Sequence, residues 1–424
     1  MIKFLFKGLI RDRSRSLFPV LTVMFGVMLT VWLYSWIKGA ENMFIESSAK
    51  FSTGHVKIMS RAYAEDASQI PNDLALIGIE ELLKNIKKDF QELIWAPRIR
   101  FAGLIDVPDE YGETRAQGPV AGLAIDLFSP GSPEKEIINL EKSIIRGRLP
   151  EKPGEILISD EFAQKLSLEP GEIATLISST MYGSMAVKNF TVAGTVRFGI
   201  TAMDSGTIVA DISDIQNALD MEDASGEILG FFKDFMYRNE KADEIKTAFN
   251  LHYSDEEDEF LPVMDTLYNQ NGLADIMAMT ESFSGVVVGI FIVAMSIVLW
   301  NAGLMGNIRR YGEIGVCLAM GEDKGHIYRS IIAESLIIGC IGSFLGTALG
   351  LAISYYLQVK GINIGSLMKD ASFMFTEVMR AKVTPVSFVI GFFPGILATL
   401  FGASISGIGI YKRKTSQLIR ELEA

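Results

Sequence analysis

The sequence predicts an α-helical membrane protein with four transmembrane helices and a large α+β domain inserted between the first two. Two observations predict this fold class. The 424-residue chain is 49% hydrophobic and contains four long runs without Asp, Glu, Lys or Arg. Its acidic residues are concentrated between the first and second runs. The four runs cover residues 17–37, 282–308, 335–359 and 383–411.

Each run is long enough to cross a bilayer. At about 1.5 Å per helical residue, even the shortest run reaches about 30 Å, the thickness of the hydrocarbon core. Buried helices of soluble proteins are shorter and carry charges near their ends, so membrane spans are favoured. The first run follows a basic segment and could instead be a signal peptide. Its length, and the lack of a small-x-small cleavage site after it, favour an uncleaved anchor.

The charge of the chain is divided unevenly. Residues 38–282 hold 22 basic and 42 acidic residues, a net of −20, and the remainder holds 17 and 9, a net of +8, which together give the formal charge of −12. A nucleic-acid binder normally has a basic excess, so nucleic acid is disfavoured as a partner. Five consecutive carboxylates at 255–259 could bind calcium, but mutual repulsion favours a solvated loop.

Lys and Arg in the short flanking segments predict the topology. There are 13 of them in the N-terminal segment, the link between spans two and three and the tail, against 4 in the loop between spans three and four. By the positive-inside rule, both termini are cytoplasmic and the acidic domain is outside. The predicted segments are a cytoplasmic N-terminal segment (1–16), span one (17–37), an extracytoplasmic α+β domain (38–282), span two (283–308), a cytoplasmic coupling segment (309–334), span three (335–359), an outer loop (360–382), span four (383–411) and a cytoplasmic tail (412–424).

Two of these segments carry further patterns. A basic stripe beside an apolar one suggests that residues 1–16 form an amphipathic helix at the membrane surface, where lipid would be a partner; a topogenic tail without fixed structure is the alternative. Residues 263–282 show a helical pattern that predicts a stalk leading into span two. The outer domain alternates helical and strand patterns, which indicates an α+β fold with two subdomains.

No catalytic or nucleotide-binding motif occurs in the chain. The sequence lacks GxxxxGK[ST], GxGxxG, HExxH and CxxC, and its three histidines are scattered. The spans are also nearly free of ionisable groups, which a coupled carrier usually keeps at mid-bilayer. The chain is therefore predicted to be no enzyme, with no catalytic residue, cofactor or metal of its own, so that ATP-driven work would require a partner subunit.

Glycines recur at four-residue spacing in three of the spans. Small residues at this spacing let membrane helices approach closely. Span three is therefore predicted to be a contact helix, within the subunit or across a dimer, and Pro394 is predicted to kink span four. The predicted packing residues are Gly285 and Gly289 in span two, Gly342, Gly346 and Gly350 in span three, and Gly391 and Gly395 in span four.

The link between spans two and three is too long and polar for a tight turn, and its pattern predicts two short helices divided at Gly321. It resembles the signature of the FtsX-type permeases of ABC transporters, a family that includes the MacB efflux and Lol lipoprotein-release permeases. The resemblance is carried by Arg310, Glu313, Ile314, Gly315, Ala319, Met320 and Gly321, followed by Ile327, Glu334, Gly339, Gly342 and Gly346. It assigns the first seven of these residues to ATPase coupling.

A second motif lies in the outer domain. Gly147, Arg148, Pro150, Gly154 and Glu155 begin a stretch, reaching Gly171, that resembles the MacB-like periplasmic core domain. Two further segments are similar to segments of the Lol permeases. They are residues 52–58, which contain a Gly-His pair, and residues 96–99, which contain a Pro-Arg pair. The Lol permeases are therefore the most similar subclass.

The resemblance implies a mechanotransmission system in a bacterial inner membrane. A cytoplasmic ABC ATPase dimer would bind ATP and Mg, dock on the coupling segment and move the periplasmic domains. A second permease, identical or paralogous, would complete the complex. The implied function is release of lipoproteins from the membrane to a periplasmic carrier. The alternatives are a MacB-like exporter of peptides or drugs, an FtsX-like regulator of cell-wall hydrolases and, from a different class, a membrane sensory receptor.

Overall fold

A computed structural model of the chain describes residues 13–199, 201–253, 258–270, 272–308, 311–363 and 378–412. The chain divides into two compact units. The helical unit comprises Met1–Asn42, Ala278–Asn363 and Val378–Ala424, and the mixed unit comprises Met43–Met277 and Ile364–Glu377. The predictions made for residues 1–12, for most of the acidic run, for residues 364–377 of the outer loop, for Arg310 and for residues 413–424 lie outside the described residues.

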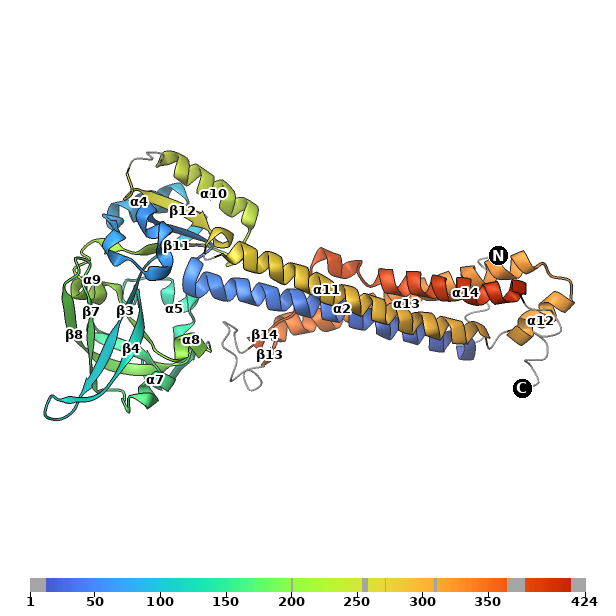
Figure 1. Cartoon of the computed structure of the whole chain (residues 1–424), viewed down its shortest axis with the longest axis horizontal. Coiled ribbons are helices and arrows are strands. Elements are labelled where there is room, and N and C mark those ends of the chain that lie inside the picture. Colours follow the sequence, from blue (N-terminus) through green and yellow to red (C-terminus); the bar gives the residue numbers. More distant parts are fainter. Residues whose placement is uncertain are drawn as a thin grey trace. The chain divides into compact units, whose positions relative to one another are not determined.

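The described residues contain four helical segments long and apolar enough to cross a membrane, as the sequence predicts. They are α2 (Arg13–Ser48), α11 (Leu273–Ile308), α13 (Lys324–Lys360) and a last segment built from η5 (Pro385–Phe388), η6 (Phe393–Leu397) and α14 (Ala398–Lys412) (Figure 1). The first three helices extend beyond their charge-free runs, because backbone hydrogen bonding continues where the apolar sequence stops. Pro394 lies in the π-helical turn η6, where the regular α-helical pattern is interrupted.

Two helix predictions need correction. The stalk helix begins at Leu273 rather than at Val263, because residues 262–266 form strand β12 (Pro262–Thr266) and pair with β1. The Asn250 side chain holds this strand by accepting from the Met264 amide and donating to the Met264 carbonyl, at 2.8 and 3.0 Å. In the coupling segment, the second short helix is the first part of α13, since nothing in the sequence breaks the helix before Lys360.

The first part of the mixed unit is a four-stranded antiparallel arrangement in the order β12–β1–β11–β3 (Figure 1). Its other strands are β1 (Val56–Ser60), β11 (Glu227–Phe232) and β3 (Leu93–Pro108). Helices α4 (Ile79–Asp89) and α10 (Asn239–His252) bury their apolar faces against it. The core between them contains Ile58, Ile86, Trp95, Ile228, Ile245, Phe249 and Met264.

The second part is a ring of strands in which each strand has a partner on both sides. Strand pairing runs β3–β4–β9–β6–β8–β7 and returns to β3. Closure of this kind leaves no free strand edge within the ring. The added strands are β4 (Thr114–Ile125), β6 (Glu155–Ser159), β7 (Ile173–Ser179), β8 (Met185–Val196) and β9 (Thr207–Asp211). The α+β composition and the two parts agree with the prediction from sequence.

The remaining elements are short. The short strands are β2 (Leu76–Ile77), β5 (Ile144–Gly147), β10 (Ala224–Ser225), β13 (Ile362–Asn363) and β14 (Val378–Met379). β13 pairs with β14. The helices are α3 (Arg61–Glu65), α5 (Glu134–Ile137), α6 (Leu140–Ser143), α7 (Asp160–Lys165), α8 (Thr201–Asp204), α9 (Ile212–Ala218) and α12 (Tyr311–Ala319), together with η1 (Ala49–Thr53), η2 (Ala67–Gln69), η3 (Asn72–Leu74) and η4 (Leu267–Asn269).

A buried ion pair lies where β3 passes from the four-stranded part to the ring. Arg98 donates to both oxygens of Glu134, each at 2.7 Å, and the two side chains are about 1% exposed. The third arm of the guanidinium donates to the Lys50 carbonyl at 2.6 Å. Because charge buried in this way is tolerated only when it is paired and hydrogen-bonded, each partner requires the other.

Removing one partner should therefore destabilise the mixed unit. We expect Glu134→Gln to cost about 3–5 kcal/mol, because it leaves the Arg98 charge buried and uncompensated. The measurement is the melting temperature of the full chain in detergent. Glu172→Gln, which breaks the exposed Arg115–Glu172 pair, is the matched control and should lower the melting temperature far less. Equal effects of the two variants would contradict the assigned importance of the buried pair.

His55, which immediately precedes β1, is also buried, with 3% exposure. Its Nδ1 accepts from the Phe232 amide at 3.0 Å, and its ring lies against Phe231, Phe232 and Tyr237. Desolvation, followed by the nearby Arg238 charge, lowers the pKa of His55 from 6.5 to about 4. The imidazole is therefore neutral in the folded protein at physiological pH.

This burial predicts a loss of stability in mild acid. Between the unfolded pKa of 6.5 and the folded pKa of about 4, the unfolded chain binds a proton that the folded chain does not, so stability falls as pH falls. The loss across this window is about 3 kcal/mol. His55→Asn keeps a side-chain acceptor for Phe232 but cannot titrate. We expect the melting temperature of the full chain to fall less steeply from pH 7 to pH 4.5 in this variant, and parallel curves would refute the assignment.

Candidate functional site

The segment between the second and third long helices is a helix, a tight turn and a new helix. α12 ends at Ala319, and Gly321 follows two residues later with a positive φ of 92° that glycine adopts without strain. The Gly321 amide donates to the Leu318 carbonyl and the Glu322 amide to the Cys317 carbonyl, both at 3.1 Å. This is the hydrogen-bond pattern of a Schellman helix end. The helix therefore stops just before the glycine that the sequence indicates.

The next helix begins at once. The Asp323 carboxylate accepts from the amides of Gly325 and His326, at 2.9 and 3.3 Å, and so caps the N-terminus of α13. Only two residues, Glu322 and Asp323, therefore separate the glycine from α13. The turn is short and is held by backbone hydrogen bonds on the α12 side and by the Asp323 side chain on the α13 side, which fixes the direction of α12 relative to α13.

One face of α12 is anchored to the other helices. Cys317 and Leu318 pack against Ile327 and Ile331 of α13 and Ala403 of α14. Away from this contact, Val316 and Met320 are 45% and 76% exposed. The result is a short helix with a half-buried face on α13 and α14 and exposed apolar side chains beside it.

The residues assigned to ATPase coupling are distributed as follows. Gly315 is buried, whereas Ala319, Met320 and Gly321 are exposed around the turn. The backbone of Glu313 and Ile314 lies in α12, but their side chains, like the whole of Arg310, are outside what the structure describes. The structure brings the described members together at one end of α12, and their role in contacting an ATPase stays a prediction.

The three predicted packing glycines of α13 each face a valine of α2. A Cβ added at Gly342, Gly346 or Gly350 would lie 2.7, 2.8 or 2.9 Å from the Cβ of its valine partner. The partners are Val23, Val27 and Val31, in that order. The two helices therefore run parallel in this contact, with the same four-residue period. The valine stripe was missed from the sequence, although its spacing matches that of the glycines.

The other predicted packing glycines behave in two ways. In the last segment, a Cβ at Gly391 would lie 2.6 Å from Val27 Cγ1, and one at Gly395 would collide with Ser343 and approach Val27 to 2.8 Å. In α11, by contrast, nothing lies within 4 Å of a Cβ added at Gly285 or Gly289. Within the described residues, these two glycines therefore form no helix contact, unlike the other five.

Contacts that the sequence did not reveal connect the C-terminal half of α2 to the segment before η5. A Cβ at Gly39 would collide with the Arg380 carbonyl, so the two backbones touch. The Lys382 amide donates to the Ser35 carbonyl at 2.9 Å, and the Ser35 hydroxyl bonds Ser387 at 3.3 Å. No spacing pattern links residues so far apart in the chain.

The glycine contacts can be tested with a single methyl group. Gly346→Ala should lower the melting temperature of the full chain in detergent, because its Cβ would come within 2.5 Å of the Met24 carbonyl and 2.8 Å of Val27. The expected cost is about 1–3 kcal/mol. Gly285→Ala is the matched control, adds the same methyl group in open space and should change stability little. The reverse order of the two effects would refute this packing.

In the described ranges, no three His, Cys, Asp or Glu side chains gather as a metal site would require. Comparison with known proteins identifies the region around α12 instead. Residues 285–415 match the family model of the FtsX-like permease C-terminal domain. This range includes α12, α13 and the last helical segment, and therefore the contacts of α12 with α13 and α14.

Curated relatives agree with this match. LolC, the lipoprotein-releasing system transmembrane protein of Xylella fastidiosa strain Temecula1, is 24% identical over 214 residues, which are 49% of this chain and 50% of LolC. The chain thus spans about half the length of this relative. An uncharacterized ABC transporter permease of Methanocaldococcus jannaschii is 21% identical over 96% of both chains. The macrolide export protein MacB of Hyphomonas neptunium is 29% identical over 110 residues, 25% of this chain and 17% of MacB.

Among solved structures, the periplasmic region of MacB from Actinobacillus actinomycetemcomitans aligns with a TM-score of 0.36 and 12% identity, over 52% of this chain and 92% of that one. The sequence matches and the four apolar helices lead to one conclusion. Residues 285–415 are similar to the FtsX-like permease C-terminal domain, and the chain is similar in sequence to LolC, to MacB and to an ABC transporter permease.

Proposed function

We propose that this chain is the membrane subunit of an ABC transporter, in which a cytoplasmic ATPase dimer drives the movement of an extracytoplasmic domain. The observation that carries the proposal is the geometry of α12. Cys317 and Leu318 pack on α13 and α14, while Met320, directly after the helix, is 76% exposed. A protein that binds at Met320 would therefore transmit force directly to α13 and α14.

Further contacts support transmission from α12 to the rest of the helical unit. α13 is packed on α2 through the three glycine–valine contacts, and α2 has no break between Arg13 and Ser48. Because close-packed helices move as units rather than deform, a displacement of α13 would be passed to α2. Hydrolysis of ATP, with its Mg, would take place in the partner, and the permease would act with a second copy or a paralogue.

The substrate proposed is a lipoprotein, released from a bacterial inner membrane to a periplasmic carrier. The similarity to LolC supports it, and the orientation follows from the basic flanks of the spans, with both termini cytoplasmic and the mixed unit periplasmic. The similarity to MacB supports a second candidate, an exporter of the macrolide type. Purification with a lipoprotein carrier supports the first candidate, and purification with an exporter's outer-membrane partner supports the second.

Two substitutions test the coupling role of α12. Glu313→Lys reverses a charge on α12, and Gly321→Leu places a bulky residue at a positive φ in its turn. We expect membrane insertion to be preserved, whereas lipoprotein release per ATP hydrolysed falls on the order of tenfold, because contacts at the centre of an interface are worth about 1–2 kcal/mol or more. The measurement is release from vesicles reconstituted with the ATPase.

The controls match each change. Glu222→Lys reverses an exposed charge in the mixed unit, and Gly112→Leu introduces the same strain at an exposed glycine with a φ of 84°. Both should leave the coupling ratio unchanged. Unchanged coupling in Glu313→Lys and Gly321→Leu as well would exclude α12 as the ATPase contact. If the reconstituted complex hydrolyses ATP and transports another substrate but releases no lipoprotein, the proposed substrate is excluded and the role of α12 is not.

A further inference from the structure

A group of three cations lies where the third span ends and the last span begins. Lys360 directly follows the charge-free run 335–359, and Lys382 directly precedes the run 383–411. Arg380 lies two residues before Lys382, and all three side chains are exposed. The ends of apolar spans lie at the level of the lipid head groups. We call Lys360, Arg380 and Lys382 the boundary patch.

Backbone contacts bring the two sides of the boundary patch together. β13 begins two residues after Lys360, and its partner β14 ends one residue before Arg380. A Cβ added at Gly361 would lie 3.2 Å from Arg380 Cγ, so the arginine side chain runs beside the residue that follows Lys360. The Val383 amide donates to Gln358 Oε1 at 2.9 Å and joins the start of the last run to α13.

α2 fixes the same backbone from another side. The Arg380 carbonyl touches Gly39, and the Lys382 amide donates to the Ser35 carbonyl at 2.9 Å. The backbone that carries the cations is therefore held in place before any ligand arrives. A ligand would order only side chains, which lowers the entropy cost of binding.

The charge of the boundary patch is not compensated. Within the described ranges, none of its three residues forms an ion pair. The partners of the two lysines are neutral: Lys360 Nζ lies 5.3 Å from the centre of the Tyr356 ring, and Lys382 Nζ donates to Asn42 Oδ1. Three positive charges are thus available to an anion.

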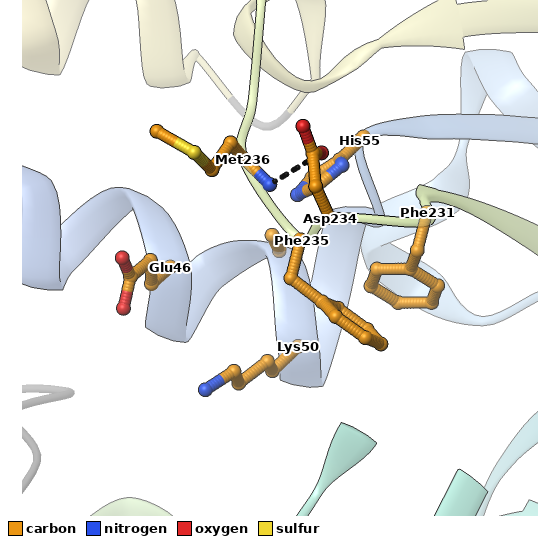
Figure 2. Close-up of a pocket in the computed structure, with 8 residues that line it drawn as sticks. Glu46, Lys50, His55, Phe231, Asp234, Phe235 and Met236 are labelled. Atoms are coloured by element: carbon orange, nitrogen blue, oxygen red, sulfur yellow. Dashed lines mark hydrogen bonds between the residues drawn. The ribbon is translucent and has the colours of Figure 1, made fainter. Parts of the chain in front are cut away.

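Two comparisons show that a patch of one sign is unusual in this chain. Lys and Arg gather at the other ends of the spans, where 13 lie against 4 in this loop, and three of those 4 form the patch. The pocket of about 210 Å³ in the mixed unit is lined by Lys50 but also by Glu46 and Asp234, so its charges offset one another (Figure 2). The boundary patch has no such offset, which favours an anionic ligand.

The surface beside the boundary patch is apolar. Tyr355, Tyr356 and Val359 are exposed on α13, and Val386 and Phe388 are exposed on η5. Tyrosine rings are favoured at the head-group level of a membrane, and aliphatic side chains are favoured against acyl chains. A ligand that follows both surfaces has an anionic head group and long apolar chains.

We propose that the boundary patch binds the phosphodiester head group of an anionic phospholipid, phosphatidylglycerol in the simplest case. Arg380 donates to the phosphate oxygens, Lys360 and Lys382 add charge, and an acyl chain lies along Tyr356 and Val359. A zwitterionic lipid is disfavoured because its own cationic group meets three cations. The site needs neither ATP nor a partner subunit, so it stands or falls independently of the proposed transport function.

The experiment captures lipid at the site itself. The full chain, with p-benzoyl-phenylalanine in place of the exposed Tyr355, is placed in nanodiscs of equal parts phosphatidylglycerol and phosphatidylcholine with the same acyl chains. After illumination, mass spectrometry gives the ratio of the two lipids attached to the chain. We expect several times more phosphatidylglycerol. The same photoreactive residue at Phe344, exposed in the middle of α13, should capture the two lipids equally.

Substitutions separate the boundary patch from general surface charge. Arg380→Gln should lower the capture ratio about fivefold, because one cation near an anionic head group contributes about that factor. Arg380→Lys keeps the charge and should retain most of the preference. Lys84→Gln removes a charge from an exposed position on α4 and should leave the ratio unchanged.

Three results would overturn the proposal: equal capture of the two lipids beside the boundary patch, an unchanged ratio in Arg380→Gln, or the same fall in Lys84→Gln. Soluble glycerol phosphate distinguishes a lipid from a free phosphate compound. It carries the head-group phosphate without the chains and should not change the ratio. A fall of the ratio at equal concentrations would identify a soluble phosphate as the ligand and exclude the lipid.

Discussion

Val27 is the residue on which the packing of the helical unit depends most. It is fully buried in α2, and glycines from two other elements lie against it: Gly346 of α13, and Gly391 and Gly395 of the last segment. In lipid, apolar contact alone provides little drive for helices to associate, so close van der Waals packing decides which helices meet. A side chain at any of these glycines would separate the helices that Val27 holds together.

The same helices carry α12, which links the packing of the helical unit to the proposed function. α13 supplies both the glycines that face α2 and the residues Ile327 and Ile331 that hold α12. α14 contributes Ala403 to that second contact. Because the turn at Gly321 is fixed by backbone hydrogen bonds on one side and the Asp323 cap on the other, α12 is a short rigid projection rather than a loose loop. Force applied to it would reach α13 and α14 without being absorbed by the turn.

The mixed unit depends in a similar way on one strand. β3 pairs with β11 up to Arg98 and with β4 from Ile99 onward, so it belongs to both parts of the unit. Arg98 stands at this junction, and its guanidinium joins β3 to Glu134 and to the Lys50 carbonyl. The position of the Lys50 backbone is therefore set by a buried ion pair.

The sequence by itself determined the four apolar helices, the α+β character of the intervening domain and the termination of α12 just before Gly321. These features depend on local properties: the length of an apolar run, the alternation of side chains and the conformational freedom of glycine. The tertiary structure alone decided that Gly346 is a contact and Gly285 is not, although both belong to the same four-residue pattern. It also decided that residues 262–266 form a strand and that the ring of His55 is buried and neutral. Each of these outcomes depends on a partner distant in the chain, such as Val27, β1 or Phe232, and no local pattern can specify such a partner.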